Sequence, residues 1–211
     1  MPRYIYLHGF ASAPSSRKAQ FFRQHFEDKG IDLAVPALDE GVFSSLTIGG
    51  QLKVVEREAA GASDVVLIGS SLGGYLAALY AARNPQQVTR AVLLAPAFCF
   101  PRRWREEMGE DKLREWRERG SIDMFHHGAK APLPMGYQLI AEAASYEDYP
   151  DLVQPSLLLH GTADTVVPAK YSEEFVKRHP ATSHVILLTS GHELTDVMDI
   201  LWNETARFLE L

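Results

Sequence analysis

The sequence predicts a single α/β domain over residues 1–211, with a mainly parallel sheet of six strands and helices on both faces. Short apolar runs, each about the length of a strand, alternate with helical patterns along most of the chain, which is typical of βαβ units. The chain of 211 residues is long enough for one sizeable core. Its 46% hydrophobic and 23% charged residues are typical of a soluble globular domain.

The expected elements follow one another in order along the chain. Apolar runs bounded by turn residues predict strands at residues 3–7, 31–35, 65–68, 91–94, 156–159 and 184–188. Patterns with helical spacing and recognisable ends predict helices at residues 16–29, 48–60, 72–83, 169–178 and 194–209. Gly30 and Gly61 close the first two helices, because glycine readily adopts the left-handed conformation that ends a helix.

One interval, residues 97–150, interrupts this alternation. Its first half predicts one or two amphipathic helices that are broken near Gly109 and end at Gly120, and its second half suggests a short hairpin. The interval carries 8 Lys or Arg against 10 Asp or Glu residues, so we expect a solvated face rather than a site for a charged ligand. We interpret residues 97–150 as a small cap inserted over the strand ends.

A nucleophile motif lies in the segment "VVLIGSSLGGYLA", where a predicted strand passes directly into a predicted helix. The spacing Gly69-x-Ser71-x-Gly73 matches the G-x-S-x-G pattern of a strand-turn-helix elbow that exposes a serine. Such a tight turn needs glycines on either side of the serine, because a Cβ there would clash. Ser71 is therefore favoured over Ser70 as the nucleophile, since Ser70 lacks the glycine frame.

Two later loops supply the partners that a nucleophilic serine needs. "LLLHGTADTVVP" places Asp164 after the fifth strand, and "LLTSGHEL" places His192 after the sixth. The carboxyl ends of parallel strands share one edge of the sheet, so the three loops are expected to converge there, with His192 as general base and Asp164 orienting it. His8 is expected to shape its loop rather than act as a base. His160 is left open between a buried structural histidine and a supporting role.

Four segments carry a resemblance to a known family: "YLHGF" after the first strand, "GSSLGGYLA", "HGTAD" and "SGHEL". Over nearly the whole chain they resemble the α/β-hydrolase superfamily, and "YLHGFASAPSSRKAQ" is similar to the small YqiA-type bacterial esterases. The resemblance implies the strand order 2-1-3-4-5-6 and an oxyanion hole made by the backbone N–H groups of Phe10 and Leu72. Leu72 also has a physical reason, because it opens a helix whose first amides are unpaired.

Several classes of function are disfavoured. A net charge of −6 without a basic cluster argues against nucleic acid as a partner, and no apolar stretch is long enough for a membrane span. No metal-binding spacing occurs, so we expect no metal or other cofactor. A single cysteine, Cys99, and an N-terminus without a signal-peptide pattern suggest a cytoplasmic protein. The sequence gives no indication of the oligomeric state.

The expected function is that of a carboxylesterase that cleaves a small-molecule substrate, a short-chain acyl ester, through an acyl-enzyme intermediate. The alternatives are a thioesterase, another acyl hydrolase or acyltransferase using the same residues, and a non-catalytic protein that binds a small molecule on the same fold. Candidate residues for lining a compact acyl pocket are Phe10, Phe98, Met124, Phe125 and Val166.

Overall fold

The computed structural model describes residues 2–211 of the chain. The main-sheet strands are β1 (Arg3–Leu7), β2 (Leu33–Ala34), β3 (Val65–Ser70), β4 (Val88–Leu94), β7 (Ser156–Gly161) and β8 (Ser183–Leu188). The helices are α1 (Arg17–Asp28), α2 (Ile48–Ala59), α3 (Leu72–Arg83), α4 (Phe100–Arg119), α5 (Gln138–Ala143), α6 (Lys170–Arg178) and α7 (Met198–Leu209), with a 3-10 turn η1 (Phe43–Ser45). A two-stranded hairpin, β5 (Ser121–His126) and β6 (Ala131–Gly136), completes the elements.

The main sheet is parallel, with the strand order β2-β1-β3-β4-β7-β8. Counting along the chain only the strands of this sheet, the order is 2-1-3-4-5-6, as expected. The register of β1 on β3 pairs Leu7 with Gly69, so the loop after β1 begins beside the serine turn. This order confirms the predicted fold class and brings the loops after β1, β3, β7 and β8 to one edge.

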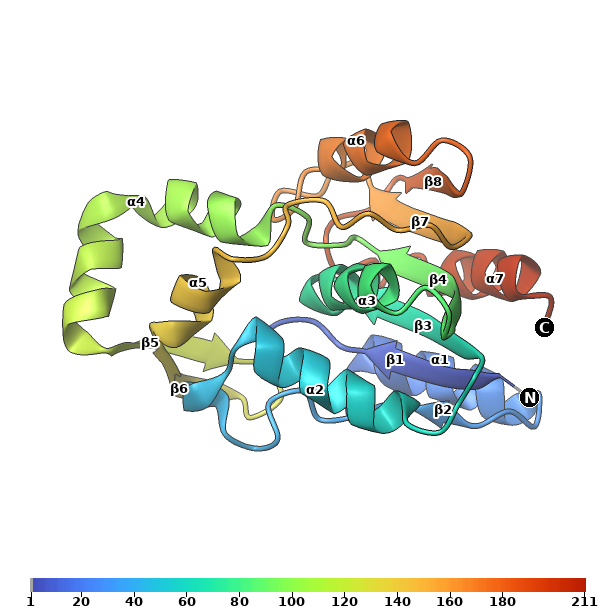
Figure 1. The fold of residues 1–211 in the computed structure, drawn as a ribbon, viewed down its shortest axis with the longest axis horizontal. Coiled ribbons are helices and arrows are strands. Elements are labelled where there is room, and N and C mark those ends of the chain that lie inside the picture. Colours follow the sequence, from blue (N-terminus) through green and yellow to red (C-terminus); the bar gives the residue numbers. More distant parts are fainter. Residues whose placement is uncertain (1) are drawn as a thin grey trace.

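Helices cover both faces of the sheet, as the apolar strands predict. Strand β1 alternates between two cores: Ile5 and Leu7 pack on the side of α2 and α3, whereas Tyr4 and Tyr6 pack on the side of α1 and α7. Figure 1 shows α2 and α3 in front of the sheet and α1 behind it. The two cores hold the strands rigidly, so the loops at their carboxyl ends start from fixed positions.

Several predicted boundaries differ from those observed. The third strand extends to Ser70 rather than residue 68, and the fourth begins at Val88 rather than residue 91. The second strand is limited to Leu33–Ala34 instead of residues 31–35, because the N–H of Ile31 donates to the carbonyl of Phe26 at the end of α1. The last helix begins at Met198 rather than at Leu194. Leu194 has φ of +54°, a left-handed conformation that an α-helix cannot include.

The segment between β4 and β7 forms α4, the β5–β6 hairpin and α5, and we call it the insertion. Gly109 interrupts α4 with φ of +74° and ψ of 160°, which produces the break expected from the sequence. The indole N–H of Trp116 donates to the carbonyl of Met135 (2.9 Å) and joins α4 to the hairpin. The N–H of His127 donates to the carbonyl of Ala11 (2.7 Å), which joins the hairpin to the loop after β1.

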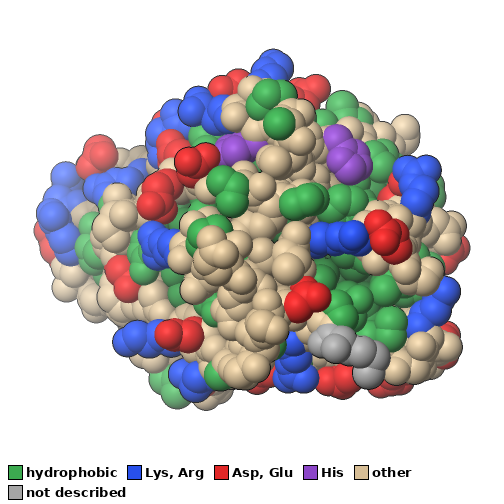
Figure 2. Space-filling model, turned by 45° about the vertical axis from the view of Figure 1, so that its right-hand side comes forward, with side chains coloured by type: hydrophobic (Ala, Val, Ile, Leu, Met, Phe, Trp, Pro, Cys, Tyr) green, Lys and Arg blue, Asp and Glu red, His purple; other side chains and the backbone are tan. Residues whose placement is uncertain are grey.

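Charged side chains of both signs are mixed over the surface drawn in Figure 2, where Lys and Arg lie among Asp and Glu. This face therefore has no broad region of a single sign, in keeping with the small net charge of −6. Among the helices of residues 2–211, none combines the length and the apolar character needed to cross a membrane.

Candidate active site

Ser71 occupies a sharp turn between the end of β3 and the start of α3. Its backbone has φ of 54° and ψ of −118°, a conformation that costs a non-glycine residue free energy and that active-site turns often retain. The Ser71 N–H donates to the carbonyl of Leu94 and its carbonyl accepts from Tyr75 and Ala97, so α3 and the end of β4 hold the turn. The strained turn presents the Ser71 hydroxyl at the edge of the sheet.

The glycines of the motif are required by close backbone approach. An added Cβ on Gly69 would collide with the backbone of Gly73, and one on Gly73 would collide with the carbonyls of Leu7 and His8. Strand and helix therefore approach each other as closely as the G-x-S-x-G spacing predicts, and the loop after β1 lies against the same turn.

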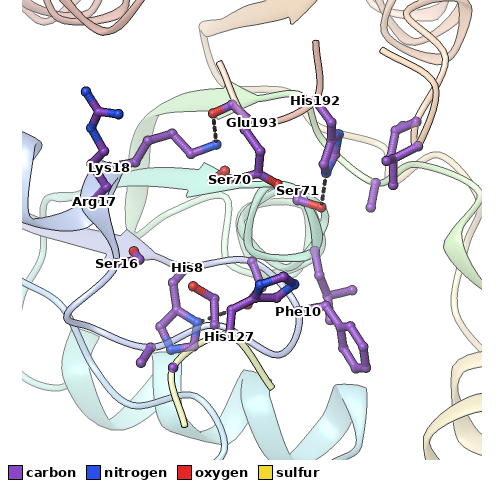
Figure 3. Close-up of a pocket in the computed structure, with 18 of the residues that line it drawn as sticks. His8, Phe10, Ser16, Arg17, Lys18, Ser70, Ser71, His127, His192 and Glu193 are labelled. Atoms are coloured by element: carbon purple, nitrogen blue, oxygen red, sulfur yellow. Dashed lines mark hydrogen bonds between the residues drawn. The ribbon is translucent and has the colours of Figure 1, made fainter. Parts of the chain in front are cut away.

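The structure brings Ser71, His192 and Asp164 into one hydrogen-bonded array. The Ser71 Oγ lies 2.9 Å from Nε2 of His192, and Nδ1 of His192 lies 2.7 Å from Oδ2 of Asp164. Because the carboxylate only accepts, the ring donates through Nδ1, and Nε2 is left to accept from the serine hydroxyl. Figure 3 shows the His192 ring directed at the Ser71 hydroxyl.

Asp164 is completely buried at its side chain, yet four donors surround it. Oδ1 accepts from the N–H groups of Val166 (2.9 Å) and Val167 (2.7 Å), and Oδ2 accepts from His192 and from Nε2 of His160 (3.1 Å). Burial by itself would raise the pKa of Asp164, but the hydrogen bonds from His160, His192 and Val167 bring this pKa below its usual range. Asp164 is therefore an ionised acceptor with a fixed orientation.

His160 is fully buried behind Asp164. Its Nε2 contacts two acceptors, Oδ2 of Asp164 (3.1 Å) and the carbonyl of Val167 (2.7 Å), so this nitrogen carries a proton. Its Nδ1 lies 2.7 Å from the hydroxyl of Ser172 on α6. The chain of contacts from Ser71 thus continues through Asp164 to a helix on the outside of the sheet.

Two residues with unpartnered backbone N–H groups line the same pocket as Ser71. Phe10 and Leu72 both line this pocket, and neither N–H donates to another backbone carbonyl or side chain within residues 2–211. Leu72 is the first residue of α3, where the helix leaves its amides without internal partners. Both groups are available to an oxygen of a ligand held beside Ser71.

His8 lies next to this loop but not in the array. Its Nδ1 is 3.0 Å from the carbonyl of Gly9, and its Nε2 accepts from the N–H of Leu38 (3.4 Å), so both ring nitrogens contact the backbone. Burial lowers the pKa of His8 from the ordinary histidine value, which favours the neutral ring that these contacts require.

The pocket in front of Ser71 has a volume of about 810 Å³, within the range usual for small-molecule sites. Of the five residues expected to line an acyl pocket, Phe10 and Val166 do so. Phe98 is instead fully buried and stacked on Phe175, while Met124 and the exposed Phe125 lie outside the lining. Within residues 2–211, no three His, Cys, Asp or Glu side chains are grouped so that they could hold a metal ion.

Several lining residues were not singled out from the sequence: Lys18, Phe100, Arg103, Trp104, His127 and Lys130. One sequence signal existed for Lys18. It lies four and eight residues before Phe22 and Phe26, which places a charged residue on the buried face of α1. The other five belong to the insertion, and their directions depend on how α4 and the hairpin fold back over the sheet.

Known proteins share the fold of this chain. It matches a putative hydrolase from Agrobacterium vitis S4 with a TM-score of 0.83 and 24% identity, covering 98% of this chain and 87% of the other. Mouse alpha/beta hydrolase domain-containing protein 10 gives a TM-score of 0.84 at 20% identity, covering 100% and 90%. Est1E from Butyrivibrio proteoclasticus, solved with ferulic acid, gives 0.79 at 18% identity, covering 100% and 90%. These structures confirm the α/β-hydrolase fold.

Two curated relatives come from Vibrio vulnificus strains YJ016 and CMCP6, and each is described as a pimeloyl-[acyl-carrier protein] methyl ester esterase. They are 27% identical to this chain over 159 residues, 60% of this chain and 62% of each relative. The chain thus spans less than two thirds of the length of these relatives.

A family match covers almost the whole sequence. The family described as Uncharacterised protein family (UPF0227) matches residues 3–209, which include every strand of the main sheet and the insertion. This family is YqiA-like, so the resemblance seen in the sequence motifs is confirmed. The chain therefore belongs to the UPF0227 family and has the α/β-hydrolase fold.

Proposed function

We propose that the protein is a serine carboxylesterase whose catalytic residues are Ser71, His192 and Asp164. The observation that carries this proposal is the unbroken array from the Ser71 hydroxyl through His192 to Asp164, which opens into a pocket beside two unpaired N–H groups. A serine hydroxyl is a weak nucleophile unless a base accepts its proton, and His192 lies where that base is needed. The description of the two curated relatives as methyl ester esterases adds support for ester cleavage.

In the first half of the reaction, the Ser71 Oγ forms a bond to the ester carbonyl carbon while Nε2 of His192 takes the hydroxyl proton. The N–H groups of Phe10 and Leu72 donate to the oxyanion that develops on the former carbonyl oxygen. The bond to the alcohol oxygen then breaks, and His192 returns its proton to that oxygen. The alcohol leaves, and the acyl group remains on Ser71.

In the second half, a water molecule replaces the alcohol. His192 takes a proton from this water as its oxygen attacks the acyl carbon, and the oxyanion again accepts from Phe10 and Leu72. The bond to the Ser71 Oγ breaks, His192 protonates the serine, and a carboxylic acid is released. Asp164 stays ionised throughout and stabilises the imidazolium that forms twice.

The preferred acyl group is short. Trp104 of α4 packs edge-on against Phe10 (5.0 Å between ring centroids) and contacts Phe100 (4.9 Å), so aromatic rings close one side of the pocket. The fully buried Trp116 packs against Trp104 and holds the Trp104 ring in place. A wall of packed rings suits an acyl chain of a few carbons better than an extended one.

The insertion acts as the cap of this site. Phe100 and Trp104 of α4 and Gly128 and Lys130 beside the hairpin line the same pocket as Ser71. Within residues 1–211 we therefore propose one catalytic domain with a cap at residues 97–150 that shapes the substrate site and contributes no member of the array. The substrate is a small-molecule ester, and no cofactor enters the reaction.

The proposal is tested with p-nitrophenyl butyrate and an alkyl fluorophosphonate. The ester should be hydrolysed, and the fluorophosphonate should abolish hydrolysis while adding one phosphonyl group to Ser71, identified by mass spectrometry of peptides. Prior incubation with the ester should slow this labelling. Turnover that persists after complete labelling of Ser71, or labelling at another serine that removes activity, would contradict the assignment.

A further inference from the structure

The pocket has two walls of different chemistry on either side of Ser71. One is the aromatic wall of Phe10, Phe100 and Trp104 described above. The other, which we call the cationic wall, comes from the loop before α1, the first turn of α1, the hairpin loop and the residue after His192. Its members are Ser12, Ser16, Arg17, Lys18, Lys130 and Glu193. Figure 3 shows Ser16, Arg17 and Lys18 to the left of Ser71 and Phe10 to its lower right.

Lys18 is the central residue of the cationic wall. Its side chain is carried on the buried face of α1 and the residue is only 9% exposed. An ammonium group has three N–H donors, and within residues 2–211 it meets a single acceptor, the carbonyl of Glu193 at 2.7 Å. No carboxylate of residues 2–211 lies within 4.0 Å of the Lys18 ammonium. Buried charges are usually paired, so this group retains donors for a ligand in the pocket.

The remaining charges of this wall are also mostly positive. Arg17 and Lys130 are exposed at the rim, and neither forms an ion pair within the described part of the chain. Glu193 is the one acidic residue here, and it is exposed to water, which screens its carboxylate. By contrast, the guanidinium of Arg103, which lines the pocket on the aromatic side, already has partners within the protein. It pairs with Glu107 (3.0 Å) and donates to the carbonyl of Val166.

The net charge of residues 97–150 does not indicate that positive side chains gather at the pocket. The interval as a whole is slightly acidic, yet it contributes the exposed Lys130 to the lining of the pocket, and the protein as a whole carries a net charge of −6. Burial lowers the pKa of Lys18, while Glu193 and Asp164 act to raise it. An anion beside Lys18 would favour the charged ammonium in the same way.

We propose that the cationic wall is an anion-binding subsite and that the preferred substrates are esters whose alcohol part carries a carboxylate or phosphate. This inference rests on the esterase function proposed above. The acyl chain and the alcohol part of an ester extend from the carbonyl carbon in different directions. If the aromatic wall holds the acyl chain, the cationic wall receives the alcohol, where Lys18 donates to the anionic oxygens and Arg17 and Lys130 attract the substrate from the rim.

The test uses three butyryl esters on one tether: 3-butyryloxypropanol, which is neutral, 4-butyryloxybutanoate, which carries a carboxylate, and 3-butyryloxypropyl phosphate. We expect kcat/KM for at least one anionic ester to exceed that of the neutral ester by about 10-fold, mainly through KM, the scale of one charge-assisted hydrogen bond. The better of the two anionic esters identifies the anion. Equal or faster cleavage of the neutral ester would overturn the proposal.

The variants separate binding of an anion from support of the His192 loop. Lys18→Gln keeps a donor for the Glu193 carbonyl but loses the charge, so the ratio of anionic to neutral kcat/KM should fall towards one. Glu193→Gln removes the opposing charge and should raise that ratio. Lys53→Gln, an exposed position on α2, is the matched control and should leave the ratio unchanged.

Two further outcomes are decisive. If Lys18→Gln slows both kinds of ester by the same factor, Lys18 only positions the loop and the subsite is excluded. If p-nitrophenyl butyrate is not hydrolysed by the wild-type protein, the esterase function itself fails, which is distinct from an active esterase that shows no preference for anions.

Discussion

The array around Ser71 and the walls of its pocket are built by different parts of the chain. Ser71, Asp164 and His192 follow strands of one parallel sheet, and their positions derive from strands packed between two cores. The walls also use the loops after β1 and β8, but most of their large side chains come from α1, α4 and the hairpin loop, which lie outside the sheet. This difference suggests that the sheet sets the chemistry of the bond broken, whereas the added segments select the substrate.

The largest effect is expected from the part built by the sheet. Ser71→Ala should lower kcat on p-nitrophenyl butyrate by on the order of 10⁴-fold or more, since the proposed nucleophile is removed. Ser70→Ala is the matched control, because Ser70 lines the same pocket but forms no hydrogen bond with His192, and this variant should retain much of its activity. Steady-state kinetics decides between them, and the opposite ranking would assign the reaction to Ser70.

His192→Ala should lower kcat nearly as much as Ser71→Ala, because Ser71 and His192 act together in the array. The loss is measured as kcat on p-nitrophenyl butyrate at neutral pH. A variant without His192 that kept wild-type rates at neutral pH would show that another group is the base.

A smaller effect on kcat is expected for His160, which contacts Asp164 but does not belong to the array. His160→Leu removes a donor from Asp164, and we expect kcat to fall by about 10-fold with little change in KM, the scale of a hydrogen bond to a charged group. His160→Gln can keep an N–H directed at the carboxylate and should restore part of the rate. Folding of both variants is checked by thermal unfolding. If both keep full kcat, His160 has a purely structural role.

The sequence predicted the array better than the walls for a physical reason. The contacts of Ser71 depend on a local glycine frame and on parallel strands that end at one edge, and both are readable in sequence. The bond from Lys18 to the Glu193 carbonyl spans 175 residues and depends on how α1 packs. The place of Trp104 depends on where the insertion folds, and the left-handed Leu194 that delays α7 has no sequence signal of its own.

Acyl length tests whether the insertion sets selectivity. Acetyl to hexanoyl esters should be turned over faster than palmitoyl esters, because Trp104 closes the aromatic wall. Trp104→Ala should move the optimum to longer chains, with a gain of up to about 4-fold for each additional CH₂ that finds a place, from roughly 0.8 kcal/mol per buried CH₂. Trp104→Phe is the control of similar shape. A maximum at dodecanoyl or longer in the wild-type protein would refute a short acyl site.

The smallest effect concerns His8, where the sheet edge meets the insertion. The loop it supports carries Phe10. Besides burial, which has the largest effect on the pKa of His8, the hydrogen bond with the Gly9 carbonyl and the charge of Asp39 raise this pKa, and His126 of the hairpin lowers it. Burial dominates and lowers the pKa of His8 in the folded state, so the unfolded chain binds the proton more readily. The contribution of neutral His8 to stability is complete above the ordinary histidine pKa, about 6.5, and is lost as pH falls towards the lower folded value.

We therefore expect the Tm of the wild-type protein to fall between pH 7 and pH 5 more steeply than that of His8→Gln. A difference on the order of 2 °C would correspond to less than about 1 kcal/mol in a chain of this length. His126→Gln, measured in parallel, reports how much of the slope belongs to the neighbouring histidine. Identical slopes for His8→Gln and the wild type would mean that His8 binds its proton equally well in the folded and unfolded chains. Protonation of His8 would then have no effect on the stability of the loop that carries Phe10.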